Sequence, residues 1–251
     1  MTRRLLILGG TGEARRLAER ALAEFDARLQ VITSLAGRTA EPVPIAGTVR
    51  QGGFGGAAGL AAYLREQAVD LLIDATHPFA DQISRNAAEA ASATGVPCLV
   101  LVRPPWCPQP GDRWIEVADA TAAAAAVRTL GTRIWLTLGT ADIEAFAPLT
   151  GHWFLVRRVD QPLAPLPLQQ VEVMLARGPF VLEDERRILA LHRIDAVVSR
   201  ASGGAATVAK LDAAREASIP VVLIARPPPP PEPTVPTVDA ALDWLRARLG
   251  A

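Results

Sequence analysis

The sequence predicts an α/β protein built from two doubly wound, mostly parallel sheets, and three observations lead to this prediction. Short apolar runs alternate with segments rich in Ala, Leu, Arg and Glu, which is the order of repeated strand–helix–strand units. The strand-like runs are continuously apolar, as in parallel sheets that are covered by helices on both faces. A proline-rich stretch at 103–114 interrupts the series, and we take it as a domain boundary.

The first predicted domain spans residues 1–103 and the second spans residues 104–251. In the first domain, apolar runs separated by helical segments predict strands at 5–9, 29–34, 69–76 and 97–103. In the second domain, the same reasoning predicts strands at 133–139, 152–159, 172–177, 195–200 and 219–226, and helices at 120–130, 182–193 and 205–217.

The last part of the second domain begins with a proline-rich segment at 227–236. Successive prolines fix φ and lack the amide donor of a helix, so this segment is predicted to be an extended polyproline spacer. Residues 237–250 then predict a capped terminal helix. The sequence leaves open which sheet this helix packs on, and whether strands are exchanged between the two sheets.

Composition and charge exclude several classes of protein. Lys and Arg together number 26, as do Asp and Glu, so no overall field favours nucleic acid or an anionic membrane. Cys98 and Cys107 form neither a metal-ligand spacing nor a disulfide framework, so we expect no metal site and a cytoplasmic location. The apolar run before Gly9 is too short for a signal sequence or a membrane span. Any recognition of anions must therefore come from local groups.

The first candidate binding loop along the chain is the GGTG turn at residues 9–12, between a predicted strand and a predicted helix. The amide groups and the positive end of the helix dipole lie at such a turn, which suits a phosphate. Gly10 and Gly12 match the first two glycines of the dinucleotide fingerprint, and Arg15 stands where the third would be. A plain strand-to-helix turn without a ligand is the alternative.

The end of the second predicted strand distinguishes between two forms of a nicotinamide cofactor. A 2′-phosphate is bound by hydroxyl groups and arginine, whereas a free 2′-hydroxyl is usually bound by Asp or Glu. Thr33 and Ser34 supply hydroxyls, Arg38 can pair with a dianion, and no acidic side chain lies between them. The sequence therefore favours NADP over NAD, with an ordinary loop arginine as the alternative for Arg38.

Two further loops are candidates for the same site. Residues 52–56 hold four glycines around Phe54, and such a loop lets the backbone approach a ligand closely. The motif DATHPFA ends the strand predicted at 69–76, so Thr76 and His77 lie where parallel sheets bind ligands. An imidazole can donate a proton near neutral pH, and bracing of the loop is the alternative role of His77.

Four motifs in order, ILGGTGEARRLA, GGFGG, DATHPFA and the segment at 199–227, resemble the precorrin-6A reductases of cobalamin biosynthesis over nearly the whole chain. The resemblance implies NADPH-dependent reduction of the precorrin-6A macrocycle to precorrin-6B, with a hydride added to a ring carbon and a proton to its neighbour. It also implies two Rossmann-like domains with a cleft between them, of which the second binds the tetrapyrrole.

The resemblance assigns site residues position by position. His77 is implied to border the nicotinamide and is a candidate proton donor or positioning residue. The family often has lysine at the position of Arg200. Arginine keeps the positive charge there but hardly releases a proton, so a role as proton donor is not expected of Arg200. The implied cofactor-binding residues are Gly10, Thr11, Gly12, Glu13, Ser34, Arg38, Gly53, Phe54, Gly55 and Thr76. The implied substrate-binding residues are Gly139, Thr140, Arg157, Arg200, Ser202, Gly203 and Gly204.

Elementary chemistry agrees with this resemblance and leaves one alternative open. A macrocycle that bears acetate and propionate groups needs distributed arginines with apolar surface between them. Hydride transfer needs no catalytic triad, because the cofactor supplies the chemistry. A short-chain oxidoreductase is disfavoured because Tyr63 is followed by Gln67 and not by the lysine of the Tyr-x-x-x-Lys pair. The remaining alternative is a non-catalytic protein that senses NADP or binds a tetrapyrrole. The sequence does not indicate the oligomeric state.

Overall fold

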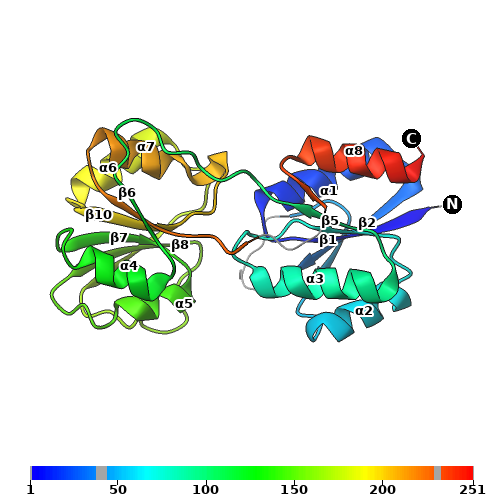
Figure 1. Ribbon diagram of the computed structural model, residues 1–251, viewed down its shortest axis with the longest axis horizontal. Helices are drawn as coiled ribbons and strands as arrows, with labels where there is room; N and C mark the ends of the chain where they lie inside the picture. Colours follow the sequence, from blue (N-terminus) through cyan, green and yellow to red (C-terminus); the bar gives the residue numbers. More distant parts are fainter. Residues whose placement is uncertain (1, 38–43, 229–232, 251) are drawn as a thin grey trace. The chain divides into compact units, whose positions relative to one another are not determined.

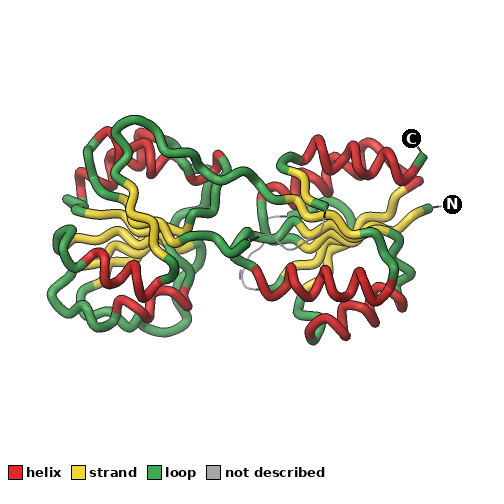
Figure 2. Tube along the Cα trace, viewed as in Figure 1, coloured by secondary structure: helices red, strands yellow, loops and turns green. Residues whose placement is uncertain are grey.

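A computed structural model describes residues 2–37, 44–228 and 233–250 of the chain. The chain forms two compact units, Met1–Pro104 with Pro227–Ala251, and Pro105–Arg226. Each unit has one six-stranded sheet with helices on both of its faces (Figures 1 and 2). Every strand pairing in both sheets is parallel. The predicted α/β class with two doubly wound sheets is confirmed.

The sheet of the first unit has the strand order β12-β5-β4-β1-β2-β3. This is the 3-2-1-4-5-6 order of doubly wound folds, with β12 in the sixth place. The order reverses between β1 and β4, and ligands of such sheets bind at the carboxyl ends of the strands at that point. The strands are β1 (Arg3–Leu8), β2 (Leu29–Leu35), β3 (Thr48–Gln51), β4 (Leu71–Asp74), β5 (Cys98–Leu101) and β12 (Thr234–Val235).

Two pairs of helices cover this sheet. Helices α1 (Gly12–Phe25) and α8 (Val238–Leu249) pack on one face, and α2 (Gly56–Glu66) and α3 (Asp81–Thr94) pack on the other. A short 3₁₀ turn, Asp26–Arg28, follows α1. The amphipathic spacing of α1 explains its packing, because its buried residues recur every three or four positions. These residues are Ala14, Leu17, Ala18, Ala21 and Phe25.

The assignment of the whole segment 104–251 to the second domain is wrong, because β12 and α8 belong to the first unit. The amide of Val100 in β5 donates to the carbonyl of Pro233 at 2.9 Å, and β12 thereby extends the first sheet. Leu242 and Leu245 of α8 are fully buried in the same core as α1. In Figure 1 the red helix α8 accordingly lies beside the blue helix α1. The predicted spacer thus contains a strand, and its residues 229–232 lie outside the described part of the chain.

The sheet of the second unit has the order β6-β11-β10-β7-β8-β9. Helices α6 and α7 cover one face, and α4 and α5 lie on the other (Figure 1). The strands are β6 (Trp114–Val117), β7 (Arg133–Thr137), β8 (Trp153–Arg158), β9 (Val171–Leu175), β10 (Ala196–Arg200) and β11 (Val221–Ile224). The helices are α4 (Ala120–Val127), α5 (Thr140–Ile143), η2 (Glu144–Phe146), α6 (Leu182–Leu191), η3 (Ala205–Thr207) and α7 (Ala209–Glu216).

The second unit repeats the first in a permuted chain order. If β7 is counted as the first strand, the order is again 3-2-1-4-5 with β6 at the edge that β12 occupies in the first unit. The segment β6-α4 precedes β7, whereas β12-α8 ends the first unit. Both segments place the helix N-cap two residues after the strand, at Asp119 and Thr237, and each cap side chain accepts a bond from the amide three residues on. The segment β6-α4 of the second unit is therefore the structural equivalent of β12-α8 in the first.

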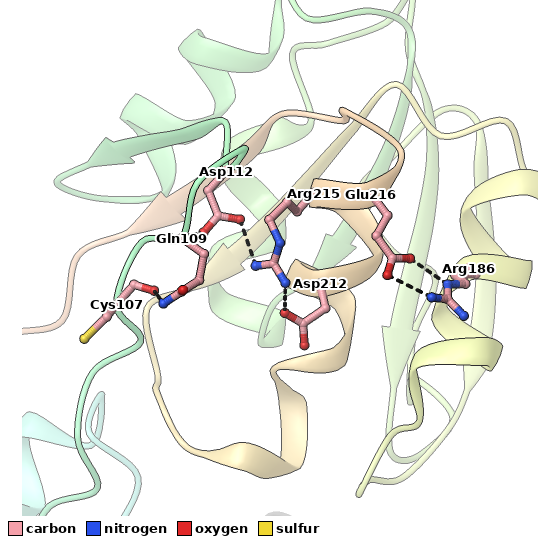
Figure 3. Close-up of polar contacts among 7 residues, drawn as sticks. All are labelled: Cys107, Gln109, Asp112, Arg186, Asp212, Arg215 and Glu216. Carbon is pink, nitrogen blue, oxygen red and sulfur yellow. Dashed lines mark hydrogen bonds and ion pairs between the residues drawn. The ribbon is translucent and has the colours of Figure 1, made fainter.

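Ion pairs hold α7 to its neighbours in the second unit (Figure 3). Arg215 binds Asp212 in its own helix at 2.5 Å and Asp112 in the segment before β6 at 3.3 Å. Arg186 of α6 makes two parallel bonds to Glu216 of α7, of 2.6 and 2.8 Å. The proline-rich stretch predicted as a boundary is thus anchored to a helix at its Asp112 end.

Within the described ranges, no helix combines the length and apolarity needed to cross a membrane.

Candidate functional site

The loop between β1 and α1 is shaped by close contacts with β2. The amide of Gly9 donates to the carbonyl of Ser34 at 2.9 Å. A Cβ atom at Gly9 would lie 2.9 Å from Cγ2 of Thr33, so a side chain would have to displace a buried strand residue. Gly10 has φ of 107°, which side chains rarely adopt. The turn therefore brings the first amides of α1 to the carboxyl edge of the sheet without any covering side chain.

Thr11 connects this turn to the loop that follows β4. Its hydroxyl oxygen caps α1 by accepting a bond from the amide of Ala14 at 3.1 Å. The same hydroxyl donates to the carbonyl of Ala75 at 2.7 Å. The Thr11 side chain thus links the two loops on either side of the point where the strand order reverses, beside the backbone bond from Ala75 to Leu8.

Glu13 lies in the first turn of α1, and two arginines compensate its charge. Oε2 of Glu13 is 3.2 Å from Nη1 of Arg103, and Oε1 is 3.5 Å from Nη2 of Arg16. Arg103 follows β5, 90 positions along the chain from Glu13. A carboxylate in the first turn also interacts favourably with the helix dipole. This arrangement neutralises a group that would otherwise repel an anion at the turn.

The loop after β4 contains the motif DATHPFA. Asp74 is 1% exposed, and its Oδ1 accepts bonds from the amide of Thr76 at 3.0 Å and from the Thr76 hydroxyl at 2.7 Å. Oδ2 of Asp74 is buried and has no hydrogen-bond partner among the described residues. Nδ1 of His77 accepts a bond from the amide of Phe79 at 3.2 Å. A neutral His77 therefore carries its proton on Nε2.

Arg50 in β3 connects the end of β2 to the loop after β3, and the sequence analysis missed this residue. Ser34 is the last residue but one of β2 and is 6% exposed, and its hydroxyl accepts a bond from Nη1 of Arg50 at 3.3 Å. Arg50 also donates to the carbonyls of Gly52 and Gly53, at 2.5 and 2.7 Å. Its guanidinium lies 3.9 Å from the ring centroid of Phe54. Arg38, predicted to act beside Ser34, lies outside the described residues.

In the second unit, the loops after β7 and β10 are joined by an ion pair. Arg200 at the end of β10 makes two bonds to the carboxylate of Asp142 in α5, of 2.7 and 2.9 Å. Gly139 is the N-cap of α5, which has only four residues. The hydroxyl of Thr140 accepts a bond of 2.6 Å from Arg158, which no sequence pattern had indicated. Three groups predicted to meet the substrate therefore lie at two neighbouring strand ends.

Arg157 is placed differently from the other predicted substrate residues. It is 7% exposed, and its Nη1 is 2.5 Å from Oε1 of Glu185, which is 1% exposed. Its guanidinium lies 3.7 Å from the ring centroid of Phe180 and 4.6 Å from that of Trp135. The side chain is thus committed to a buried ion pair against aromatic rings, on the face of the sheet that α6 covers.

The loop after β10 is braced by aromatic and cationic side chains. The indole of Trp106 donates to the carbonyl of Gly204 at 2.8 Å. Nζ of Lys210 donates to the carbonyl of Thr207 at 3.0 Å and lies 5.0 Å from the ring centroid of Trp106. Ser202 is 7% exposed within this loop. The predicted residues 202–204 are therefore held in a defined conformation.

No group of three or more potential metal ligands occurs among the described residues.

The sequence model of the family described as precorrin-6x reductase CbiJ/CobK matches residues 4–246. The chain belongs to this family. A precorrin-6A reductase of Rhodococcus erythropolis is 51% identical over 243 residues, which are 96% of this chain and 97% of that protein. A precorrin-6A reductase of Rhodobacter capsulatus is 44% identical over 242 residues, 96% and 95% of the two chains. The resemblance drawn from the sequence motifs is confirmed.

More distant relatives and a solved structure agree with this placement in the precorrin-6x reductase family. A cobalt-precorrin-6A reductase of Salmonella typhimurium is 30% identical over 233 residues, 90% of this chain and 88% of that protein. A structure described as CobK precorrin-6A reductase matches with a TM-score of 0.91 at 43% identity and covers 100% of this chain and 98% of that one. The similarity therefore includes both units.

The site residues that the family resemblance implies fall into two sets, one in each unit. The predicted cofactor residues that are described lie near the end of β2 or follow β1, β3 and β4, and so lie at the carboxyl edge of the first sheet. The predicted substrate residues other than Arg157 end β10 or follow β7 and β10, at the carboxyl edge of the second sheet. Arg50 and Arg103 lie at the same edge of the first sheet, and Arg158 ends β8 at the same edge of the second.

Proposed function

We propose that this chain is an NADPH-dependent reductase that converts precorrin-6A to precorrin-6B in cobalamin biosynthesis. The observation that supports this most is the 51% identity, over 96% of the chain, to a precorrin-6A reductase. The substrate class follows from the names of the relatives, and the loops at the strand ends agree with a site for large anions. We also propose a cytoplasmic location, with which the reduced thiols of Cys98 and Cys107 are compatible.

The residues of the first unit fit a dinucleotide. The β1–α1 turn has no room for a side chain at Gly9, adopts positive φ at Gly10 and presents the first amides of α1, as a pyrophosphate requires. We propose a Rossmann-like role for this unit, in which Gly10, Thr11 and Gly12 hold the pyrophosphate. The loop of Gly53, Phe54 and Gly55 would approach the cofactor from the end of β3, while Glu13 keeps Arg103 in place.

Ser34 and Arg38 are proposed to contact the 2′-phosphate. Hydroxyl and guanidinium groups distinguish that phosphate from a free hydroxyl. Thr76, fixed by Asp74, is proposed to border the nicotinamide at the end of β4. These side chains orient the ring for transfer of its hydride, which is the chemistry that NADPH supplies when bound.

The proton that completes the reduction needs a second donor, and His77 is proposed for this role. Its Nδ1 accepts the Phe79 amide, so its exchangeable proton is on Nε2. In the second unit, Gly139, Thr140, Arg200 and residues 202–204 are proposed to bind the macrocycle, with arginines facing its carboxylates. We propose a core role for Arg157, because its guanidinium is engaged by buried Glu185.

An anaerobic assay tests this function directly. The chain is incubated with NADPH and precorrin-6A, and the loss of nicotinamide absorbance is followed together with the mass of the macrocycle. We expect both to change in equal amounts, with a slower reaction when NADH replaces NADPH. Binding of both molecules without oxidation of NADPH would instead identify a non-catalytic tetrapyrrole- or NADP-binding protein.

A further inference from the structure

Arg50 and Ser34 lie side by side at the carboxyl edge of the first sheet. They are direct partners in the pairing of β3 with β2, and Nη1 of Arg50 is 3.3 Å from the Ser34 hydroxyl. In sheets of this order the end of β2 is where the adenosine ribose of a dinucleotide is recognised. The guanidinium of Arg50 therefore lies beside the residue proposed to contact the 2′-phosphate.

The guanidinium is held in one orientation by three sets of contacts. It donates to the carbonyls of Gly52 and Gly53, at 2.5 and 2.7 Å, and to the Ser34 hydroxyl. It also lies over Phe54, 3.9 Å from the ring centroid, and 5.2 Å from the ring centroid of Tyr63. A guanidinium has five N–H donors, so these bonds leave donors for a further acceptor. An ordered cation with remaining donors is suited to recognising a dianion by charge-assisted bonds.

Arg50 and Arg103 both lie at this edge of the sheet, but their charges have different neighbours. The guanidinium of Arg103 forms an ion pair with the carboxylate of Glu13. Among the described residues, no carboxylate forms an ion pair with Arg50, and the side chain is only partly buried. Its polar protein contacts are neutral carbonyl and hydroxyl oxygens, which leave the positive charge available to an anion.

We propose that Arg50, together with Ser34, contacts the 2′-phosphate and determines the preference for NADPH over NADH. This inference rests on the proposed function and deepens it. Because the same guanidinium holds the carbonyls of Gly52 and Gly53, the contact with the phosphate also orders the glycine loop after β3. Arg50 is in this sense both a specificity-determining and a positioning residue.

Titration calorimetry with two small nucleotides isolates the 2′-phosphate from the rest of the cofactor. The affinities of 2′,5′-ADP and 5′-AMP are measured for the unmodified protein and for Arg50→Met, Arg50→Lys and Arg38→Met. Arg65→Met is the matched control, because Arg65 lies in the same unit, is exposed and donates to the carbonyl of Ala93. Thermal unfolding of each variant establishes that it is folded.

The expected results concern the ratio of the two affinities. The unmodified protein and Arg65→Met should prefer 2′,5′-ADP, and Arg50→Met should reduce that preference by about tenfold to a hundredfold, as for loss of a bond to a charged group. Arg50→Lys, which keeps the charge and perturbs folding less, should retain part of the preference. In kinetics, Arg50→Met should raise KM for NADPH far more than KM for NADH.

Two results would overturn the role of Arg50. Equal weakening of both nucleotides in Arg50→Met and Arg50→Lys would show that Arg50 only orders the loop. Loss of the preference in Arg38→Met, with the preference kept in both Arg50 variants, would assign the phosphate to Arg38 alone. An unmodified protein that binds both nucleotides equally would instead contradict the proposed use of NADPH, which is a different failure.

Discussion

The hydroxyl of Thr11 donates a hydrogen bond to the carbonyl of Ala75 at 2.7 Å and joins the loop after β1 to the loop after β4. These loops flank the point at which the strand order of the first sheet reverses. One loop presents the first amides of α1, and the other presents Thr76 and His77. Together with the bond from the amide of Ala75 to the carbonyl of Leu8, the Thr11 side chain therefore sets the spacing between the proposed pyrophosphate site and the proposed nicotinamide site.

Replacing Thr11 by valine keeps its shape and removes both of its hydrogen bonds. We expect the free energy of unfolding to fall by about 1 to 2 kcal/mol, because a helix cap and a partly buried hydrogen bond are lost. We also expect KM for NADPH to rise several-fold while the affinity for the tetrapyrrole stays unchanged. Urea unfolding and steady-state kinetics measure the two effects. Thr11→Ser, which keeps the hydroxyl, is the control and should resemble the unmodified protein.

The buried pair of Arg157 and Glu185 makes a prediction about stability and substrate binding together. Removal of either charge leaves the other buried without its partner, so Arg157→Met and Glu185→Leu should each destabilise the chain by about 3 to 5 kcal/mol. The double variant Arg157→Met/Glu185→Leu should recover most of that loss, because no buried charge remains. Denaturant unfolding at neutral pH measures these values.

The same double variant decides between two roles for Arg157. If Arg157 serves the core, the double variant should bind the tetrapyrrole with nearly unchanged KM. A tenfold or greater rise in KM, in a protein that remains folded, would instead show that Arg157 meets a substrate carboxylate, as the family resemblance implies.

The ion pair between Asp142 and Arg200 predicts competition with the substrate. A carboxylate of the macrocycle can bind Arg200 only by sharing its guanidinium with Asp142, which makes two bonds to it. Asp142→Asn should therefore lower KM for the tetrapyrrole by about fivefold, a coupling of ~1 kcal/mol. Arg200→Met should raise that KM and leave KM for NADPH unchanged. If Asp142→Asn and Arg200→Met both raise KM, the pair is needed for the shape of the loop.

Much of the fold could be predicted because central parallel strands are buried on both faces. Runs such as Leu5–Leu8 and Val221–Ile224 are continuously apolar and read directly as strands. The edge strands β3, β6 and β12 were missed, since they are half-exposed and lack such runs. The pairing of β12 with β5 joins residues more than 130 positions apart in the chain. The pairing goes together with the packing of α8 in the core of the first unit, and no local sequence pattern indicates such a long-range contact.

The candidate site divides in the same way between local and long-range signals. The turn at Gly10 and the motif at Thr76 and His77 are local, so the sequence alone indicated them. Arg103 reaches Glu13 across 90 positions, which spacing in the sequence does not reveal. Arg50 had a usable signal, because it stands directly before the glycine-rich loop at 52–56. Alternation of side chains along β8 also indicates that Arg157 and Arg158 point to opposite faces, although not which one is buried.

Acid should weaken the contact between α6 and α7. The two bonds from Arg186 lower the pKa of Glu216 from its ordinary value of 4.5, against a smaller opposing effect of burial. A carboxyl with a lowered pKa in the folded state contributes stability above its unfolded pKa, and that contribution is lost as pH falls through the folded value. We therefore expect stability to decline below about pH 4.5, and less so in Glu216→Gln.

Salt and a second pair provide the controls for the acid effect. Both side chains of the Arg186–Glu216 pair are exposed, so high salt should reduce the difference between Glu216→Gln and the unmodified protein. Arg246 lowers the pKa of Glu24 in the same way between α8 and α1 in the first unit. Glu24→Gln should show a similar acid response. Equal acid sensitivity of Glu216→Gln and the unmodified protein would exclude this pair as a cause.

His77 is tested by separating turnover from cofactor binding. His77→Ala removes the proposed donor at Nε2 and should lower kcat by about a hundredfold or more, the contribution typical of a placed acid. The affinity for NADPH should stay near that of the unmodified protein, because the groups proposed to hold the dinucleotide are the amides of α1 and the loop after β3. His77→Asn keeps a side chain at the loop and should be equally slow. Unchanged turnover in both variants, measured under single-turnover conditions, would mean that water delivers the proton.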